Sequence, residues 1–287
     1  MKQINLILIL TLLNSCNYNI ENDENDNTKK DNVKEEIIEK SPKEMLSEAY
    51  QLFKEGNDQA SIKLANKVLA IGRSSNNDTL VGKALTSLCR NSQRKLDTTR
   101  LTELSYELNE LSNSSGNREW LMYSAHMNAE MWRLIGNMDK AEKFYNESMK
   151  ISLDMGKIGM YTIDHFNKSF VSIAKGNFEE AKNLIIRYYQ LRKENDFPDE
   201  DAYGLIAIAY LLEQQKNYIA AHEVAEATRR LFKSQNIYPE PPDEKPLILV
   251  ENKVKEMLTP KKLEEISTKS NSATVASLLE KHLNKSN

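Results

Sequence analysis

The side chains that most often perform catalysis or bind metals are few in this chain of 287 residues, and their spacing suits neither role. None of the four histidines belongs to a His-Glu-x-x-His run. His126 and Glu130 are four residues apart and would share a helix face, but two ligands are too few for a metal site. The carboxylates are scattered at helix-surface spacing, and no Gly-x-Ser-x-Gly or Cys-x-x-Cys run occurs. We therefore expect a protein that is not an enzyme, with no metal and no cofactor.

The charge balance excludes another class of function. The 39 basic and 42 acidic residues give a net charge of −3. No large basic field is present to neutralise phosphates, so nucleic acid is not the expected partner. The Gly-x-x-x-x-Gly-Lys-Ser/Thr run of nucleotide-binding loops is also absent.

The first residues predict export and lipid attachment. Lys2 precedes the short apolar run 4–13, which is too short to span a bilayer and is typical of a signal peptide, here residues 1–15. The Leu-Asn-Ser-Cys sequence that ends at Cys16 resembles a bacterial lipobox, in which the cysteine is lipidated and becomes the first residue. The alternative is an ordinary secretory signal followed by an incidental cysteine. The resemblance implies a protein anchored to a membrane of the bacterial envelope, either periplasmic or surface-exposed.

Residues 16–43 are rich in Asn, Asp, Glu and Lys and predict a disordered tether, because such a segment buries little apolar surface. Its acidic part (Glu21, Asp23, Glu24 and Asp26) resembles the stretch that sends some Bacteroidetes lipoproteins to the cell surface. A solvated spacer explains the same charges equally well. The second cysteine, Cys89, lies on a predicted helix, and we expect an inert buried thiol.

The remaining elements follow a repeat of 40 residues. Five two-residue turns lie 40 apart, and each is followed, five residues after its first member, by a mostly small or apolar residue. Glycine accepts the left-handed backbone that ends a helix, and Asn or Asp caps the next one, so each unit reads as helix, turn, helix. The turns are Gly56-Asn57, Leu96-Asp97, Gly136-Asn137, Gly176-Asn177 and Lys216-Asn217, and the following residues are Ser61, Leu101, Ala141, Ala181 and Ala221.

These units resemble the tetratricopeptide repeat, and Gly176-Asn177-Phe178-Glu179-Glu180-Ala181 is the best match. The resemblance implies an all-α right-handed superhelix of five helix pairs over residues 44–236. Ser61 and Leu101 depart from the small residue expected at their position, which leaves close packing there open.

Residues 237–287 break the period and predict a helical cap for the last repeat. The proline-rich segment 238–242 is expected to be non-helical. Helices are expected at about 244–258, 260–267 and 274–283. Together with the 40-residue array, this segment resembles the terminal helical domain of large bacterial signalling ATPases and regulators.

The repeat register predicts an inner groove. With the turn glycine at position 15, the resemblance places positions 2, 5, 9 and 12 of each first helix on the groove and positions 4, 7, 8 and 11 in the core. Repeat four reverses this pattern, with polar His165, Lys168, Ser169 and Ser172 at the core positions. Either the helix is rotated, which we favour because an unpaired buried Lys168 would be costly, or its apolar residues form an exposed patch in the groove.

The second interpretation gives the candidate binding residues, which all belong to repeats three to five. They are Tyr123, His126, Glu130, Arg133, Phe166, Phe170, Tyr203, Ile206 and Tyr210. Apolar and aromatic residues on a concave surface are typical of peptide grooves. The expected function is a lipid-anchored scaffold or assembly module for an unknown protein or peptide. The alternatives are a sensor for a small peptide signal and an accessory subunit of an envelope enzyme.

Overall fold

A computed structural model describes residues 40–197, 201–237 and 239–283. The chain divides into two compact units, Met1–Glu39 and Lys40–Asn287, and everything below concerns the second. The predicted signal peptide, Cys16 and nearly all of the tether lie outside the described residues.

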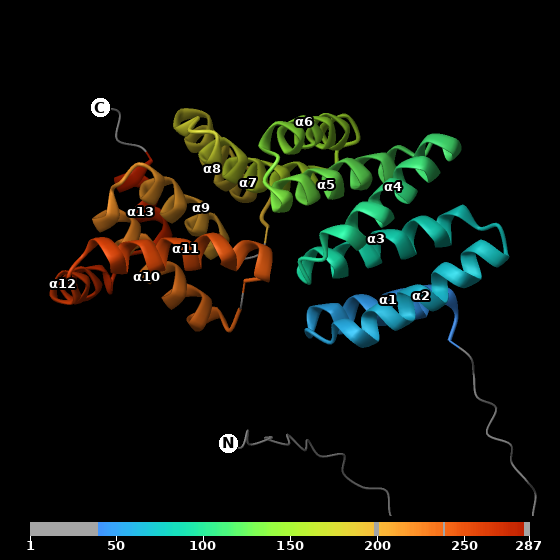
Figure 1. Ribbon diagram of the computed structural model, residues 1–287, viewed down its shortest axis with the longest axis horizontal. Coiled ribbons are helices and arrows are strands. Elements are labelled where there is room, and N and C mark those ends of the chain that lie inside the picture. Colours follow the sequence, from blue (N-terminus) through green and yellow to red (C-terminus); the bar gives the residue numbers. More distant parts are fainter. Residues whose placement is uncertain (1–39, 198–200, 238, 284–287) are drawn as a thin grey trace, which may run out of the picture. The chain divides into compact units, whose positions relative to one another are not determined.

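The second unit is an all-α superhelix of consecutive helix pairs followed by a helical cap, as predicted (Figure 1). Among the described residues there is no strand. The paired helices are α1 (Pro42–Lys54), α2 (Asp58–Ser74), α3 (Asp78–Arg94), α4 (Thr98–Ser115), α5 (Arg118–Ile135), α6 (Met138–Asp154), α7 (Ile158–Ala174), α8 (Phe178–Glu194), α9 (Asp201–Gln214) and α10 (Tyr218–Gln235). The cap consists of α11 (Pro241–Met257), α12 (Pro260–Ser270) and α13 (Val275–His282). No helix of the described part is long and apolar enough to cross a bilayer.

The turns repeat every 20 residues, at half the spacing that the sequence indicates. The residue that follows the last helical turn has a positive φ at ten equally spaced positions. These are Gly56, Asn76, Leu96, Gly116, Gly136, Gly156, Gly176, Asp196, Lys216 and Asn236. Turns within a pair and turns between pairs thus share one left-handed geometry, and Leu96 (φ 57°) and Lys216 (φ 62°) adopt it without being glycine.

The start of the second helix of most pairs is stabilised by a side-chain N-cap and by a buried residue in its first turn. The side chains of Asn57, Asp97, Asn137 and Asn217 each accept a hydrogen bond from the backbone N–H three residues ahead. The five residues expected to pack closely are all fully buried, including Ser61 and Leu101. The departures from a small residue therefore do not loosen the first two repeats.

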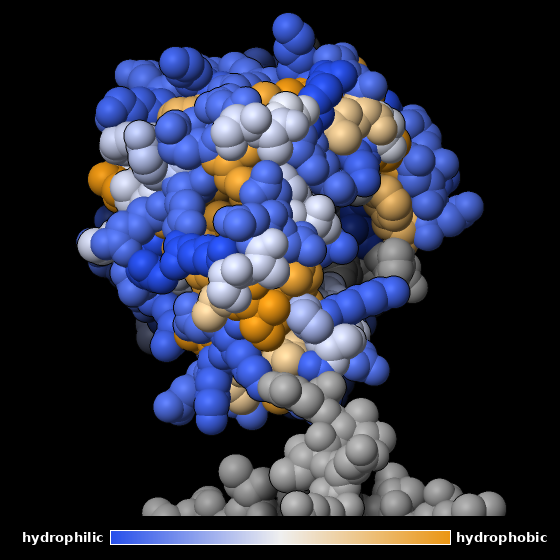
Figure 2. Space-filling model, turned by 90° about the vertical axis from the view of Figure 1, so that its right-hand side faces the viewer, coloured by the Kyte–Doolittle hydropathy of each residue, from blue (hydrophilic) through white to orange (hydrophobic). Residues whose placement is uncertain are grey.

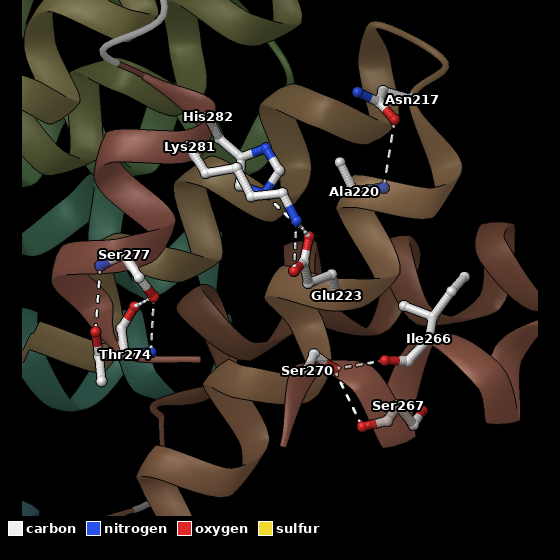
Figure 3. Close-up of polar contacts among 10 residues, drawn as sticks. All are labelled: Asn217, Ala220, Glu223, Ile266, Ser267, Ser270, Thr274, Ser277, Lys281 and His282. Atoms are coloured by element: carbon white, nitrogen blue, oxygen red, sulfur yellow. Dashed lines mark hydrogen bonds and ion pairs between the residues drawn. The ribbon is translucent and has the colours of Figure 1, made fainter. Parts of the chain in front are cut away.

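The cap differs from the prediction at its start. Helix α11 begins at Pro241, so part of the proline-rich segment is helical. Pro241 and Pro242 occupy the first turn, where a backbone N–H has no partner within the helix and the fixed φ of proline is suitable. Thr259 caps α12 and Pro260 is its first residue, as expected. At the far end, Glu223 of α10 accepts hydrogen bonds from Lys281 (2.7 Å) and pairs with His282 (3.2 Å), which attaches α13 (Figure 3).

Helix α11 packs on α9 as well as on α10. Its Leu247, Val250 and Val254 share one apolar core with Phe170 of α7 and Ile206 of α9. Because α9 is the first helix of its pair, α11 lies against the inner side of the last repeat. Glu240, the N-cap residue of α11, also pairs with Arg94 at the end of α3 (2.7 Å).

Candidate binding groove

Two hollows lie along the first helices of the repeats. The first, called the N-terminal groove below, has a volume of about 440 Å³ and is built by α1, α3 and α5. Its lining is aromatic and apolar with several cations. The residues are Lys43, Leu46, Ser47, Tyr50, Phe53, Leu80, Lys83, Thr86, Ser87, Arg90, Glu119, Trp120 and Tyr123.

The second hollow, called the central cavity below, has a volume of about 500 Å³. It is lined by residues of α1, α3, α5, α7, α8 and α9, by Phe197, and by Glu240 and Asp243 at the start of the cap. Tyr50, Phe53 and Arg90 line both hollows, so the two adjoin. Figure 2 shows the side of the molecule that lies to the right in Figure 1, where hydrophobic side chains form separate patches in a largely hydrophilic surface.

The groove register accounts for the lining residues of the first two repeats. Its four positions in α1 are Lys43, Leu46, Tyr50 and Phe53, and in α3 they are Lys83, Thr86, Arg90 and Gln93. Every one of these eight side chains lines one or both hollows. None of these eight residues was among the predicted site residues, although the groove register of repeats one and two identifies them.

Trp120 forms a wall of the N-terminal groove, and its position depends on a glycine. A Cβ atom added to Gly82 of α3 would lie 2.3 Å from the Trp120 ring, so only glycine leaves room for this contact. Trp120 as a whole is 6% exposed. Glycine in a helix interior costs stability, and here it allows α3 and α5 to approach closely.

The apolar stripe of α7 is packed, as the favoured interpretation expects, but the polar face is buried too. Phe166 and Phe170 are only 6% and 4% exposed, so the predicted exposed patch is absent. The polar face is buried as well, because all residues from Asp164 to Ile173 are buried, so the helix has not simply rotated. Lys168 is not an unpaired charge, since its Nζ lies 2.9 Å from Glu180 of α8. The helix is therefore surrounded by protein on both its apolar and its polar side.

The neighbouring helices α8 and α9 bury the apolar side of α7, since Phe166 packs against Tyr188 and Tyr203, and Phe170 packs against Tyr210. Phe166, Phe170 and Ile206 belong to the same core cluster as Leu247 and Val250 of α11. The apolar side of repeat four is thus closed by its neighbouring helices, and α11 extends the same core from α9. The N-terminal groove lies over repeats one to three, and the central cavity reaches from repeat one to repeat five.

A buried polar network holds the polar side of α5 and α7. His126 Nδ1 lies 2.6 Å from an Asp164 oxygen, and Ser148 donates to the other oxygen at 2.6 Å. Burial alone would lower the pKa of His126, but the Asp164 carboxylate outweighs it and raises that pKa. The Asp164 carboxylate, buried between α5 and α6, is therefore satisfied by partners on both helices.

Glu130 and Arg133 form the second half of this network. Glu130 accepts hydrogen bonds from Arg133 (2.6 Å), from Gln93 (2.8 Å) and from the Tyr145 hydroxyl. Burial would raise the pKa of Glu130, but Arg133 and His126 lower it overall. His126 and Glu130, which share a face as expected, are thus engaged with protein groups. The described residues contain no group of three or more side chains placed to hold a metal ion.

The nine candidate residues consequently have different surroundings. Tyr123 lines the N-terminal groove, and His126, Phe166 and Tyr203 line the central cavity. The others lie in the interior or against it, with Ile206 and Glu130 fully buried and Tyr210 packed on Phe170 at 6.1 Å between ring centroids. Ligand binding by any of the nine stays a prediction.

The comparisons with known proteins agree with the fold. No protein-family model matches the chain, and no curated protein matches it. The solved structures that match include the apo form of RapI, with a TM-score of 0.53, 15% sequence identity, and coverage of 75% of this chain and 84% of that chain. A tetratricopeptide repeat protein from Parabacteroides merdae ATCC 43184 aligns with a TM-score of 0.33, 14% identity, and coverage of 80% and 98%. The likeness to RapI shows a shared fold of the tetratricopeptide-repeat type and nothing more specific.

Proposed function

We propose that this protein is a non-enzymatic binding module that holds an extended segment of a protein or peptide partner on the inner face of its superhelix. The observation that carries the proposal is the pair of adjoining hollows on the inner face, lined largely by groove-position residues. Hollows of 300–1,000 Å³ with apolar walls and a few placed polar groups are typical ligand sites.

The composition of the open face supports this function. Tyr50 is 47% exposed on the inner side of α1, where both hollows meet. Tyr, Trp and Arg are the residue types that contribute most to protein interfaces, and all three line the N-terminal groove. An aromatic side chain left exposed in a concave surface provides contact area for a partner at low entropic cost.

Affinity capture tests the proposal. The full-length protein and its Tyr50→Ala variant are used as baits on a detergent extract of the membranes of the cells that make it, with Tyr106→Ala as the control. Tyr106 is 64% exposed on α4, a second helix that lines neither hollow. We expect wild type and the control to retain a stoichiometric protein that Tyr50→Ala retains at least tenfold less. Equal retention by all three baits would contradict binding at this face.

A sensor of a short peptide is the second candidate, and the sizes of the hollows favour it. Each of them, at about 440 and 500 Å³, has room for only a few residues of a ligand. Thermal stabilisation by short peptides, without retention of any protein, would support the sensor over the scaffold.

We further propose that Cys16 carries the lipid that anchors the module to an envelope membrane. Support comes from the basic start, the apolar run and the placement of the cysteine. Two or three acyl chains would give firm anchoring, since one chain alone is marginal. Cys16→Ser should move the protein from the membrane fraction to the soluble fraction, as judged by immunoblotting. A variant that stays in the membrane fraction would refute the lipid anchor.

A further inference from the structure

The N-terminal groove contains cations without acidic partners. Elsewhere on the inner face the arginines are paired, as Arg94 is with Asp58 (3.1 Å) and Arg133 is with Glu130 (2.6 Å). Within the part of the chain that the structure describes, Lys43, Lys83 and Arg90 form no ion pair with a carboxylate. Glu119 is the one acidic residue in the groove lining, and Lys157 neutralises it at 2.8 Å. The groove therefore presents a positive field with no internal counter-charge.

Arg90 is held in place despite lacking an anion. Its guanidinium lies 5.9 Å from the centroid of the Tyr50 ring and 5.8 Å from that of the Tyr123 ring. These two rings belong to α1 and α5, on either side of α3, so the cation is flanked by aromatic faces from both neighbouring repeats. Stacking of this kind restricts the arginine side chain, which lowers the entropy lost when it binds a ligand.

The rest of the lining defines a second feature of the ligand. Trp120, seated on Gly82, and Leu80 provide an apolar surface in the same groove. An extended peptide places successive side chains in different directions, so a carboxylate on Arg90 leaves a neighbouring side chain free to contact this surface.

We propose, on the basis of the binding function proposed above, that the N-terminal groove binds an extended acidic peptide. Arg90 forms a bidentate ion pair with a carboxylate of the ligand, between Tyr50 and Tyr123. A large apolar ligand side chain packs against Trp120 and Leu80, and Lys43 and Lys83 contribute attraction from the rim. Charge complementarity selects the peptide, because the groove offers three free cations and one neutralised carboxylate.

Two matched peptide pools test this inference on the full-length protein in detergent. Both are fluorescein-labelled octapeptides with random Leu, Phe, Trp or Ala at six positions. One pool has Glu at the two remaining positions, and the other has Gln. Fluorescence anisotropy should show the Glu pool binding about tenfold more tightly, as expected for one charge-assisted pair, with the advantage shrinking as salt is raised.

Variants assign the preference to Arg90. Arg90→Gln should reduce the tenfold preference to less than about threefold, and Arg90→Lys should restore part of it, as one charge is worth about tenfold here. Lys83→Gln, at an exposed position, should weaken Glu-pool binding by a smaller factor. Arg100→Gln serves as the control, because Arg100 is paired with Glu103 on α4, outside the groove. Thermal melting of each variant verifies that it is folded.

The possible results distinguish the preference for an acidic peptide from the more general function of binding a peptide or protein. Equal binding of both pools, abolished by Tyr50→Ala, would overturn the acidic ligand and leave the peptide groove standing. An unchanged preference in Arg90→Gln would likewise overturn the role of Arg90. Binding of neither pool would overturn the acidic-peptide proposal, while the capture experiment above would still decide whether the inner face binds a protein.

Discussion

Phe170 illustrates how a residue at a groove position became part of the core. Its ring lies 5.0 Å from that of Phe166 and 6.1 Å from that of Tyr210, and the Arg133 guanidinium lies 5.6 Å from its centroid. With 4% of its surface exposed, the side chain makes contacts throughout its circumference. It serves packing in this structure and is not displayed to a ligand.

Truncation of this ring should therefore be costly. We expect Phe170→Ala to lower the free energy of unfolding by about 3–5 kcal/mol, from lost burial and the cavity left behind. Ile163→Ala, on the same helix but 46% exposed, should cost less than about 1 kcal/mol. Urea denaturation followed by circular dichroism measures both. Similar small losses for the two variants would mean that the ring is not packed as described.

The sequence predicted the position of Phe170 on its helix but not its environment. The register placed it on the inner side of α7, and its ring packs there against Tyr210 of α9. What covers that side is Tyr210 of α9, together with the Arg133 guanidinium of α5. No local pattern reports such a contact, because helical periodicity shows that a face is apolar and not which element covers it.

The same limit applies to Arg90. Its type and position were visible in the sequence, and so were Tyr50 and Tyr123 at the equivalent groove positions of the neighbouring repeats. Stacked repeats bring equivalent positions side by side, so the juxtaposition was predictable in principle. The absence of a carboxylate partner was not, because that depends on where every acidic side chain of the fold lies.

At the scale of elements, the helix pairs and their 40-residue repeat were predictable, but the shared backbone geometry of all the turns was not. Glycines at 56, 136 and 176 indicated the turns within pairs, since glycine tolerates a positive φ. The turns between pairs include Asn76, Asp196 and Asn236, which are common residues in many contexts. A left-handed conformation at Leu96 costs roughly 1–2 kcal/mol, and packing of the flanking helices imposes it against local preference.

At the start of α11, the effect of proline depends on its position in the helix. Proline is a helix breaker in the interior of a helix but suits the first turn, and the proline-rich segment supplies that first turn. The expectation of a non-helical segment was therefore wrong for Pro241 and Pro242, which lie in the first turn of α11. Glu240, immediately before Pro241, then becomes the N-cap residue and is free to pair with Arg94.

At the scale of the whole second unit, charged residues join the cap to earlier repeats. Asp243 of α11 lies 4.0 Å from Arg133 of α5, with 20% of its side chain exposed. Burial raises the pKa of Asp243 to about 7, although Arg133 opposes the shift. The ordinary value is 3.8, so the folded state holds this proton over a range in which the unfolded state has lost it.

This shift gives a prediction with a definite sign. Between about pH 4 and pH 7 the folded state binds more protons at Asp243, so stability should fall as pH rises, by at most about 1.4 kcal/mol per unit. Asp243→Asn removes this contribution, and the variant should gain stability relative to wild type as pH increases through this window. Urea denaturation at half-unit intervals measures the difference.

Asp154→Asn provides the control for this experiment, because Asp154 is half-exposed and pairs with Arg118 on the surface. Its stability relative to wild type should show a much weaker dependence on pH over the same window. Parallel pH profiles for wild type and Asp243→Asn would show that the carboxylate is not buried as the fold requires.

The contact of Arg94 with Glu240 has a consequence for how the molecule opens. In a row of stacked repeats the terminal units have one neighbour each, so the ends fray before the middle does. Here Arg94 contacts the Phe53 carbonyl of α1 and Asp58 of α2, and at the same time Glu240, the N-cap residue of α11. The first two repeats are therefore joined to the cap through Arg94, as well as to the repeat that follows them in the sequence. Loss of either end would be felt at the other, and amide protons of α1 should exchange with solvent in step with those of α11.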